Sequence, residues 1–285
     1  IISSQYVSDS IDQLTEFGYN EFYSPLKLLE NYDVNKYDHL ISRKYIQTQI
    51  TGIQKAHEAY FNEKKTFMRS LDVMITTKCS MKCESCSNLM QYYTNPENSD
   101  YKKIINEVNI ITDHVDYISE FRVIGGEPLM NKEWANITND LLKDDPKRNI
   151  YIYTNGTVGP KDQQLEMLQG KGVNFVITDY GKFSRNIENM KEKLTKYNLA
   201  FVATEVKNWT DCSSLREHHR TPAQLQEVYK QCCAKFLYTL LDGKLYSCPF
   251  IANAAKLKAI KDNPANYVDL YAEAEILKKR INLLF

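Results

Sequence analysis

Three cysteines of this chain, Cys79, Cys83 and Cys86, lie within eight consecutive positions in the spacing C-x3-C-x2-C. They follow closely on an apolar segment, residues 71–76, that we expect to form a strand. Thiolates are soft ligands that suit zinc or iron–sulfur clusters. A structural zinc site usually takes four ligands arranged as two pairs, whereas this loop offers three. Three thiolates can hold three irons of a [4Fe–4S] cluster and leave the fourth iron open to a ligand from outside the chain.

A second motif, Gly125-Gly126-Glu127-Pro128, closes the next predicted strand. Glycine allows the backbone to approach a ligand closely, and the carboxylate of Glu127 can accept hydrogen bonds from an ammonium group. Taken by itself, the motif also fits an ordinary turn between a strand and a helix. Its position one strand after the cysteines is what makes a shared site the better interpretation.

From residue 70 the chain alternates between apolar strand patterns and amphipathic helical patterns. The predicted strands are 71–76, 121–124, 150–154, 173–178 and 199–206, and the predicted helices are 102–114, 133–143, 161–169 and 186–197. This alternation predicts parallel β/α units with right-handed crossovers. In such folds the reactive groups lie on loops after the carboxyl ends of the strands, and both motifs fall on those loops.

Together, the two motifs and their places after successive strands resemble the radical S-adenosylmethionine (radical SAM) superfamily. The resemblance implies that the three cysteines ligate a [4Fe–4S] cluster whose open iron chelates the amino and carboxylate groups of S-adenosylmethionine (SAM). It also implies that one electron from the cluster cleaves SAM to methionine and a 5′-deoxyadenosyl radical, which abstracts hydrogen from a substrate. The residues expected to hold the SAM amino group are Gly125, Gly126, Glu127 and Pro128.

The ends of the third and fourth predicted strands extend the resemblance. Radical SAM enzymes line the SAM ribose and the substrate cavity at these levels, which implies cofactor contacts for Thr154, Asn155, Thr178 and Asp179. Asx-type turns are the alternative interpretation of the same residues. The family commonly has an aromatic residue just before its third cysteine, where this chain has Ser85. The adenine contact is therefore expected from Met90, Tyr92 or Tyr93.

Four further cysteines lie in the last third of the chain: Cys212, Cys232, Cys233 and Cys248. Nine residues separate Cys233 from Gly243, and four separate Gly243 from Cys248, a spacing that resembles the SPASM and twitch extensions of radical SAM enzymes. The resemblance implies an auxiliary [4Fe–4S] cluster on these cysteines. Asp242-Gly243 between two apolar runs predicts a hairpin, which would fold Cys248 back toward the earlier cysteines. Buried, reduced cysteines without metal are the alternative.

The chain is expected to have four parts within a mixed α/β fold class. They are a truncated α/β segment or N-terminal arm (1–35), a helical connector (36–69), a partial (β/α)6 TIM-like barrel (70–206) and a small twitch-like domain with a hairpin (207–285). The last helix is predicted to begin at Asn263-Pro264. We expect further residues before Ile1 and after Phe285, because the chain lacks an initial Met and ends in an apolar run.

The composition excludes several classes of function. The 285 residues include 36 Lys and Arg and 36 Asp and Glu, so the formal net charge is zero. That balance argues against a nucleic-acid or polybasic membrane surface, and no run of about 18 apolar residues predicts a membrane span. No secretory signal is visible and the cysteines are clustered, which favours the reducing cytoplasm.

We therefore expect a radical SAM enzyme that oxidises or epimerises a small molecule, a sugar or sugar nucleotide, as in radical SAM proteins of bacterial polysaccharide and natural-product pathways. The resemblance implies an external electron donor such as flavodoxin or ferredoxin, and no residue beyond the cofactor ligands stands out as catalytic. A peptide-modifying radical SAM maturase is the first alternative. A non-enzymatic iron–sulfur or zinc-binding module is the second, and it would have no use for the Gly-Gly-Glu-Pro motif.

Overall fold

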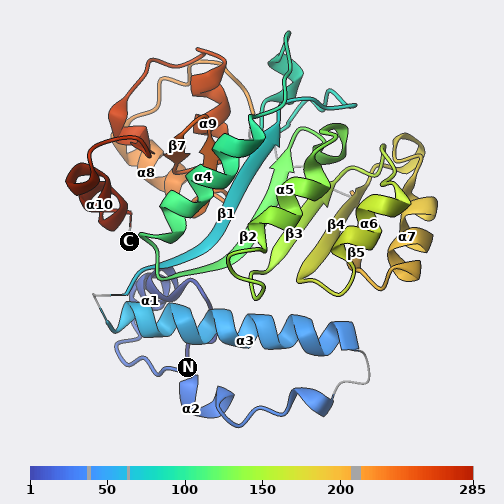
Figure 1. The fold of residues 1–285 in the computed structure, drawn as a ribbon. Coiled ribbons are helices and arrows are strands. Elements are labelled where there is room, and N and C mark those ends of the chain that lie inside the picture. Colours follow the sequence, from blue (N-terminus) through green and yellow to red (C-terminus); the bar gives the residue numbers. More distant parts are fainter. Residues whose placement is uncertain (37–39, 63–64, 207–212, 285) are drawn as a thin grey trace.

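The structure, a computed structural model, describes residues 1–36, 40–62, 65–206 and 213–284. At its centre lies a sheet whose eight strands are ordered β5-β4-β3-β2-β1-β6-β7-β8 (Figure 1). Neighbouring strands are parallel from β5 to β6, and β7 and β8 are antiparallel additions at one edge. The strands are β1 (Phe67–Thr76), β2 (Tyr117–Gly125), β3 (Ile150–Thr154), β4 (Val173–Asp179), β5 (Ala200–Glu205), β6 (Leu237–Leu241), β7 (Lys244–Tyr246) and β8 (Tyr267–Asp269).

Four helices follow the first four strands and lie along one face of the sheet (Figure 1). They are α4 (Tyr101–Thr112), α5 (Trp134–Leu141), α6 (Asp162–Leu168) and α7 (Ile187–Lys196). Short 3-10 turns, η2 (Met90–Tyr92), η3 (Pro128–Met130) and η4 (Gly181–Phe183), lie on the loops after β1, β2 and β4. All five strands and all four helices predicted for this region are present, which confirms the mixed α/β class and the parallel sheet of a partial TIM-like fold.

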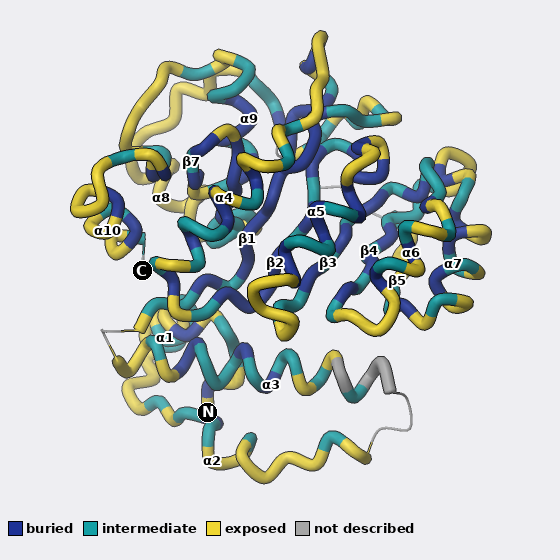
Figure 2. Tube along the Cα trace, in the orientation of Figure 1, coloured by how far each residue is buried: buried dark blue, intermediate teal, exposed yellow. Residues whose placement is uncertain are grey.

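The strand β1 is buried on both of its faces over most of its length, whereas the residues of β3 alternate between buried and half-buried and those of β5 are mostly exposed. Every residue of β1 from Ser70 to Thr76 is buried. On the helical face, Trp134 of α5 and Phe175 of β4 are almost completely buried and meet edge to face, with ring centroids 6.0 Å apart. Figure 2 shows the resulting buried centre along β1, β2 and β3, with exposed residues concentrated in the loops around it.

An ion pair is buried between the two longest strands of the sheet, β1 and β2. Asp72 of β1 and Arg122 of β2 are partners in register, and Arg122 Nε lies 3.1 Å from Asp72 Oδ1. The Arg122 guanidinium also stacks over the Tyr153 ring, 4.3 Å from its centroid. Opposite charges allow both side chains to be buried, since breaking such a pair would leave an uncompensated charge inside the sheet.

After α8 (Pro222–Lys230) the chain returns to the sheet as a hairpin. Asp242 and Gly243 connect β6 to β7 with positive φ values of 51° and 76°, the backbone conformation that Asp-Gly favours in a two-residue hairpin turn. The predicted hairpin is therefore present. Its first strand, β6, pairs in parallel with β1, so the hairpin extends the central sheet.

The helices of the C-terminal part differ from the prediction. The last helix, α10 (Ala274–Asn282), does not begin at Asn263-Pro264, where the structure has a 3-10 turn, η5 (Pro264–Asn266). The predicted start was wrong because residues 267–269 pair with β7 as β8 and end the turn. A further helix, α9 (Pro249–Lys256), was not predicted.

The N-terminal residues form a helical arm. Residues 1–36 contain α1 (Val7–Glu16), α2 (Leu26–Leu29) and η1 (Val34–Lys36) and no strand, and α3 (Leu40–Tyr60) then crosses the amino-terminal ends of the parallel strands (Figure 1). Two ion pairs attach α1 to the end of α8 and the residues after it. Asp9 Oδ2 lies 2.8 Å from Lys235 Nζ, and Glu16 Oε1 lies 2.6 Å from Lys230 Nζ. The domain boundaries at residues 35, 69 and 206 stay predictions.

Candidate iron–sulfur and cofactor site

The loop after β1 holds the first three cysteines, Cys79, Cys83 and Cys86, each of them half-buried. Burial, with contributions from the nearby Glu127, Cys86 and Cys83, raises the pKa of the Cys79 thiol to about 11. Burial also raises the pKa of Cys83, and Cys86 adds to that rise. The three sulfurs are thus close enough to influence one another. A bound metal ion reverses this effect, because it deprotonates the thiols that ligate it.

Protein contacts anchor the cysteine loop. Lys82, which precedes Cys83, donates hydrogen bonds to the carbonyl oxygens of Met90 at 2.8 Å and Tyr93 at 3.1 Å. Asn155 Nδ2 lies 3.8 Å from Cys79 Sγ. Across the described ranges, no three Cys, His, Asp or Glu side chains are gathered into a closed metal site. The three thiols therefore share one anchored loop, and ligating a common cluster requires their side chains to turn toward one another.

Gly125 and Gly126 bring the end of β2 into close contact with the start of this loop. A Cβ atom on Gly125 would lie 2.2 Å from the carbonyl oxygen of Thr76, and one on Gly126 would lie 2.3 Å from that of Lys78 and 2.7 Å from Cys79 Cβ. Cβ atoms do not occupy such distances, so only glycine fits. The Gly126 amide donates to the Thr76 carbonyl oxygen at 3.0 Å. The glycine pair thereby fixes the end of β2 against Cys79.

Glu127 is fully buried and its carboxylate accepts three hydrogen bonds. The donors are the Thr154 hydroxyl at 2.8 Å, the Asn155 amide at 2.8 Å and the Leu129 amide at 3.1 Å. Burial raises the pKa of this carboxyl to about 7, and no described Lys or Arg side chain opposes that rise. Pro128 follows as the buried first residue of η3. A buried carboxylate with fixed donors and no cation is suited to an ammonium group supplied by a ligand.

The predicted residues at the ends of β3 and β4 lie in different surroundings. At the end of β3, the structure brings Thr154 and Asn155 to Glu127, as their hydrogen bonds show. At the end of β4, Asp179 Oδ1 accepts a hydrogen bond from the Gly181 amide at 2.7 Å, which is the Asx-type turn of the alternative interpretation. Thr178 is half-buried on β4 directly before it.

Two further residues of the site were not singled out by the sequence. Burial, with contributions from the three thiols and Glu127, raises the pKa of Tyr180, which places the phenol beside the cysteine loop. Its adjacency to Asp179 is the signal that could have included it. Asn88 is buried and donates from Nδ2 to the Gly125 carbonyl oxygen at 2.8 Å, and nothing in the sequence around it indicates that role.

The three residues expected near adenine lie in two different environments. Met90 and Tyr93 are 2% and 8% exposed and pack in a small core with Met74, Leu241, Tyr246 and Ala252. Tyr92 is exposed, with 43% of its surface accessible. Of the three, Tyr92 alone therefore keeps a largely free ring.

The later cysteines are positioned by α8 and α9. Cys232 follows α8, and Cys248 is the N-cap of α9, where its sulfur accepts a hydrogen bond from the Ile251 amide at 3.5 Å. Burial raises the pKa of Cys248, and nearby Cys232 adds to the rise. Cys233 is exposed, and Cys212 lies outside the described residues. The structure thus leaves Cys233 at the surface, whereas Cys232 is half-buried and acts on the charge of the Cys248 thiol.

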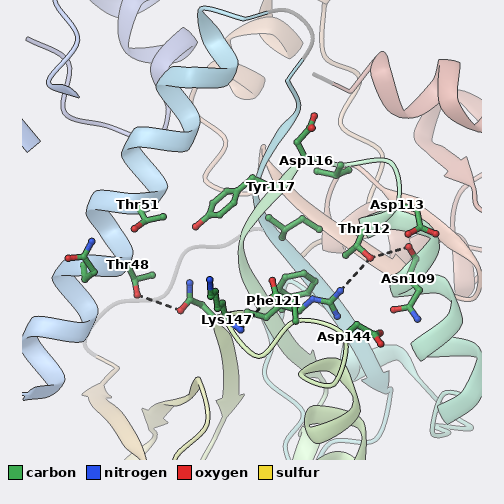
Figure 3. A pocket seen from close by; sticks show the side chains of 16 residues that line it. Thr48, Thr51, Asn109, Thr112, Asp113, Asp116, Tyr117, Phe121, Asp144 and Lys147 are labelled. Carbon is green, nitrogen blue, oxygen red and sulfur yellow. Dashed lines mark hydrogen bonds between the residues drawn. The ribbon is translucent and has the colours of Figure 1, made fainter. Parts of the chain in front are cut away.

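A cavity of about 750 Å³ lies at the other end of the sheet, between α3 and the loops that precede β2 and β3 (Figure 3). Thr48 and Thr51 of α3, Tyr117, Phe121 and Lys147 are among the residues that line it. Neither a cysteine nor any residue predicted for the cofactor contributes to its lining. Reactive groups of parallel β/α folds lie at the carboxyl ends of the strands, so this cavity is not the candidate reaction site.

Sequence comparisons bear on the strand and loop region just described. Residues 73–198 match the family described as the Radical SAM superfamily. The chain is 26% identical over 221 residues to a probable GTP 3′,8-cyclase of Methanocaldococcus jannaschii, and the alignment covers 70% of each chain. It is 30% identical over 145 residues to a GTP 3′,8-cyclase of Petrotoga mobilis, with 44% of each chain covered.

Among solved structures, BtrN in complex with AdoMet and 2-DOIA is similar to this chain at 17% identity and a TM-score of 0.45. That alignment covers 76% of this chain and 87% of BtrN. None of the helices in the described part of the chain is long and apolar enough to cross a membrane.

Proposed function

Because residues 73–198 match the Radical SAM superfamily, we propose that the cysteine loop and the Gly-Gly-Glu motif hold the two cofactors of that family, a [4Fe–4S] cluster and SAM. In this proposal Cys79, Cys83 and Cys86 ligate the cluster. When bound, the cofactors supply one-electron cleavage of SAM and hydrogen abstraction from a substrate. The chain's own task is to bind and orient them and to exclude water.

The observation that carries the proposal is the environment of Glu127. This carboxylate is fully buried, accepts three hydrogen bonds and has no cationic partner among the described residues. An ammonium group would supply the missing charge, since charge-assisted hydrogen bonds are the stronger class. The preceding residue, Gly126, lies against Cys79, so the ammonium site and the thiols are adjacent.

The residues around Glu127 are arranged to keep its position constant. Thr154 and Asn155, at the end of β3, donate to the Glu127 carboxylate. The backbone amide of Glu127 donates to the Lys78 carbonyl oxygen at 2.8 Å. A carboxylate fixed from both sides can meet a ligand without reorganising, which is the benefit of preorganisation.

For the later cysteines we propose an auxiliary iron–sulfur site that includes Cys232 and Cys248. The half-buried settings of both cysteines and the place of Cys248 at a helix N-cap support this assignment. A helix N-terminus favours negative charge, so the position of Cys248 at the N-cap of α9 stabilises its thiolate form. Cys212 and Cys233 are the remaining candidates for this set, and Cys233 is less suitable than Cys232 because it is exposed.

The substrate is proposed to be a sugar or sugar nucleotide that is oxidised or epimerised, with a separate one-electron donor such as flavodoxin or ferredoxin. Cyclisation of a nucleoside triphosphate is the second candidate, because both similar curated proteins are GTP 3′,8-cyclases. Product analysis by mass spectrometry separates the two. Oxidation removes two hydrogens from the substrate, whereas an epimerisation or a cyclisation conserves its mass and changes its retention or connectivity.

Anaerobic reconstitution followed by iron counting and a SAM-cleavage assay with reductant tests the cofactor assignment. About eight irons per chain and release of 5′-deoxyadenosine support two [4Fe–4S] clusters, and about four irons support the SAM site alone. Zinc in place of iron, with no cleavage of SAM, would refute the proposal that the protein is a radical SAM enzyme.

Single cysteine variants then assign the two sites. Cys83→Ala is expected to abolish SAM cleavage, whereas Cys248→Ala is expected to spare uncoupled cleavage and to block product formation. Cys233→Ala is the matched control, because its side chain is exposed and its loss should leave the iron content close to that of the parent protein. Loss of all cleavage in a folded Cys248→Ala protein would contradict this division of roles.

A further inference from the structure

A chain of hydrogen bonds joins the segments that hold the two groups of cysteines, and its central link, Tyr93 to Asn253, is buried. Lys82, next to Cys83, donates to the carbonyl oxygen of Tyr93 at 3.1 Å. The Tyr93 hydroxyl donates to Asn253 Oδ1 at 2.8 Å, and Asn253 Nδ2 donates to the carbonyl oxygen of Pro249 at 2.8 Å. Pro249 directly follows Cys248. The path therefore runs from the residue before one predicted iron ligand to the residue after another.

The central link of this path is enclosed on all sides. Asn253 has no exposed surface and Tyr93 is 8% exposed, and the hydrogen bond between them is buried. Asn253 Nδ2 also lies 3.4 Å from the Met74 sulfur at the end of β1. A buried acceptor that loses its donor bears the full cost of desolvation. The Tyr93 hydroxyl is thus the group that keeps α9 seated against the cysteine loop.

An ion-pair network at the surface reinforces the same contact. Lys256, at the end of α9, lies 2.9 Å from Glu97 Oε1 and 2.7 Å from Asp242 Oδ2. Glu97 lies on the segment that follows the cysteine loop, and Asp242 lies in the hairpin turn. One lysine therefore fastens α9 to both of the elements that flank it.

We propose that Tyr93 and Asn253 are positioning residues that fix Cys248 relative to the cysteine loop, so that the two iron sites form one rigid unit. This inference rests on the proposed function, because it assumes that Cys248 ligates an auxiliary cluster. The physical reason is tolerance: metal–ligand distances hold within about 0.2 Å, and the eight residues of α9 cannot keep that accuracy without an anchor. The anchor is the hydrogen bond that crosses from one cysteine segment to the other.

The first test uses the metal-free protein and the variant Tyr93→Phe, which keeps the ring and deletes the hydroxyl. Cysteine alkylation by iodoacetamide under anaerobic conditions is followed residue by residue with mass spectrometry. We expect Cys248 to react roughly tenfold faster in the variant, because loss of a buried hydrogen bond opens the local structure. Cys79 should react at its original rate. A general loosening would accelerate both thiols equally, and that result would overturn the proposal.

Two further variants keep this test interpretable. Tyr101→Phe is the matched control, since the Tyr101 hydroxyl also bonds a side-chain acceptor, but one on α5, Asp140, rather than on α9. It should leave the rate at Cys248 unchanged. Lys256→Met removes only the surface ion pairs and should accelerate Cys248 about two- to fivefold, in line with the modest strength of such pairs. An unchanged rate at Cys248 in Tyr93→Phe would refute the anchor, whatever the rate in Lys256→Met.

The second test counts iron after reconstitution in the parent protein, Cys248→Ala and Tyr93→Phe. We expect Tyr93→Phe to lose at least half of the iron that depends on Cys248 and to keep the remainder. If Cys248→Ala holds as much iron as the parent, the auxiliary site of the proposed function is refuted, and the inference falls with it. If Cys248→Ala loses iron while Tyr93→Phe matches the parent protein in iron and in alkylation, the anchor alone is refuted.

Discussion

Gly126→Ala tests whether the contact between β2 and the cysteine loop positions Cys79. The added Cβ would lie 2.3 Å from the carbonyl oxygen of Lys78 and 2.7 Å from Cys79 Cβ, whereas non-bonded heavy atoms rest about 3.5 Å apart. One neighbour is backbone, so relief requires the segment before Cys79 to move by about 1 Å. Overpacking of this kind costs about 1–3 kcal/mol. The displacement also exceeds the tolerance of about 0.2 Å for a metal ligand.

Two measurements follow this variant. In the metal-free protein, the midpoint of thermal unfolding should fall by about 2–12 °C, since each kcal/mol shifts the midpoint by about 2–4 °C in a domain of comparable size. After anaerobic reconstitution, the iron held by the cysteine loop should fall by more than half, and SAM cleavage should fall with it. Both effects have one cause, which is the displaced backbone at Cys79.

Gly159→Ala serves as the control on the loop after β3. Its added Cβ would lie 3.6 Å from Asn186 Oδ1, an ordinary van der Waals contact, so stability and iron content should stay close to those of the parent. If Gly126→Ala retained the iron content and SAM cleavage of this control, the glycine contact would not position Cys79, and the reasoning from packing would be wrong.

Three other outcomes are expected. Glu127→Gln should weaken SAM binding roughly 10- to 100-fold in equilibrium dialysis of the reconstituted protein, because hydrogen bonds to charged groups contribute about 1.5–3 kcal/mol; unchanged affinity would remove Glu127 from the site. Burial lowers the pKa of His57, which is 1% exposed, so the unfolded chain takes up the proton first as the pH falls. The free energy of unfolding in urea should therefore decrease below about pH 6.5, and His57→Phe should flatten that decrease. The same pH dependence in His57→Phe and the parent protein would show that His57 does not cause it. Asp9→Asn breaks the partly buried pair with Lys235 and should lower the free energy of unfolding by about 1 kcal/mol; no change would show that this pair does not hold the arm.

Much of the fold could be predicted because β1 to β4 each bring several apolar side chains to a buried face of the sheet. Such short apolar segments between helical patterns mark strands in a sequence, and β1 to β5 were found within a few residues of their true ends. The parts that failed depend on contacts between distant segments. Asn263-Pro264 has the residue types of a helix start, but residues 267–269 pair with β7 and stop it. Helix α9 has only eight residues after Cys248, too few to show a clear period.

The sequence by itself determined which chemical groups the site contains and where each lies along the chain. Three thiols in one loop, two glycines before Glu127 and an Asp-Gly turn are properties of short segments, so their spacing carries the information. The tertiary structure alone decided which groups meet. It brings Thr154 to Glu127, half-buries Cys232 while it leaves Cys233 exposed, and bonds Tyr93 to a residue 160 positions away. Such pairings depend on which strands are neighbours and how helices pack, and neither partner's local sequence records them.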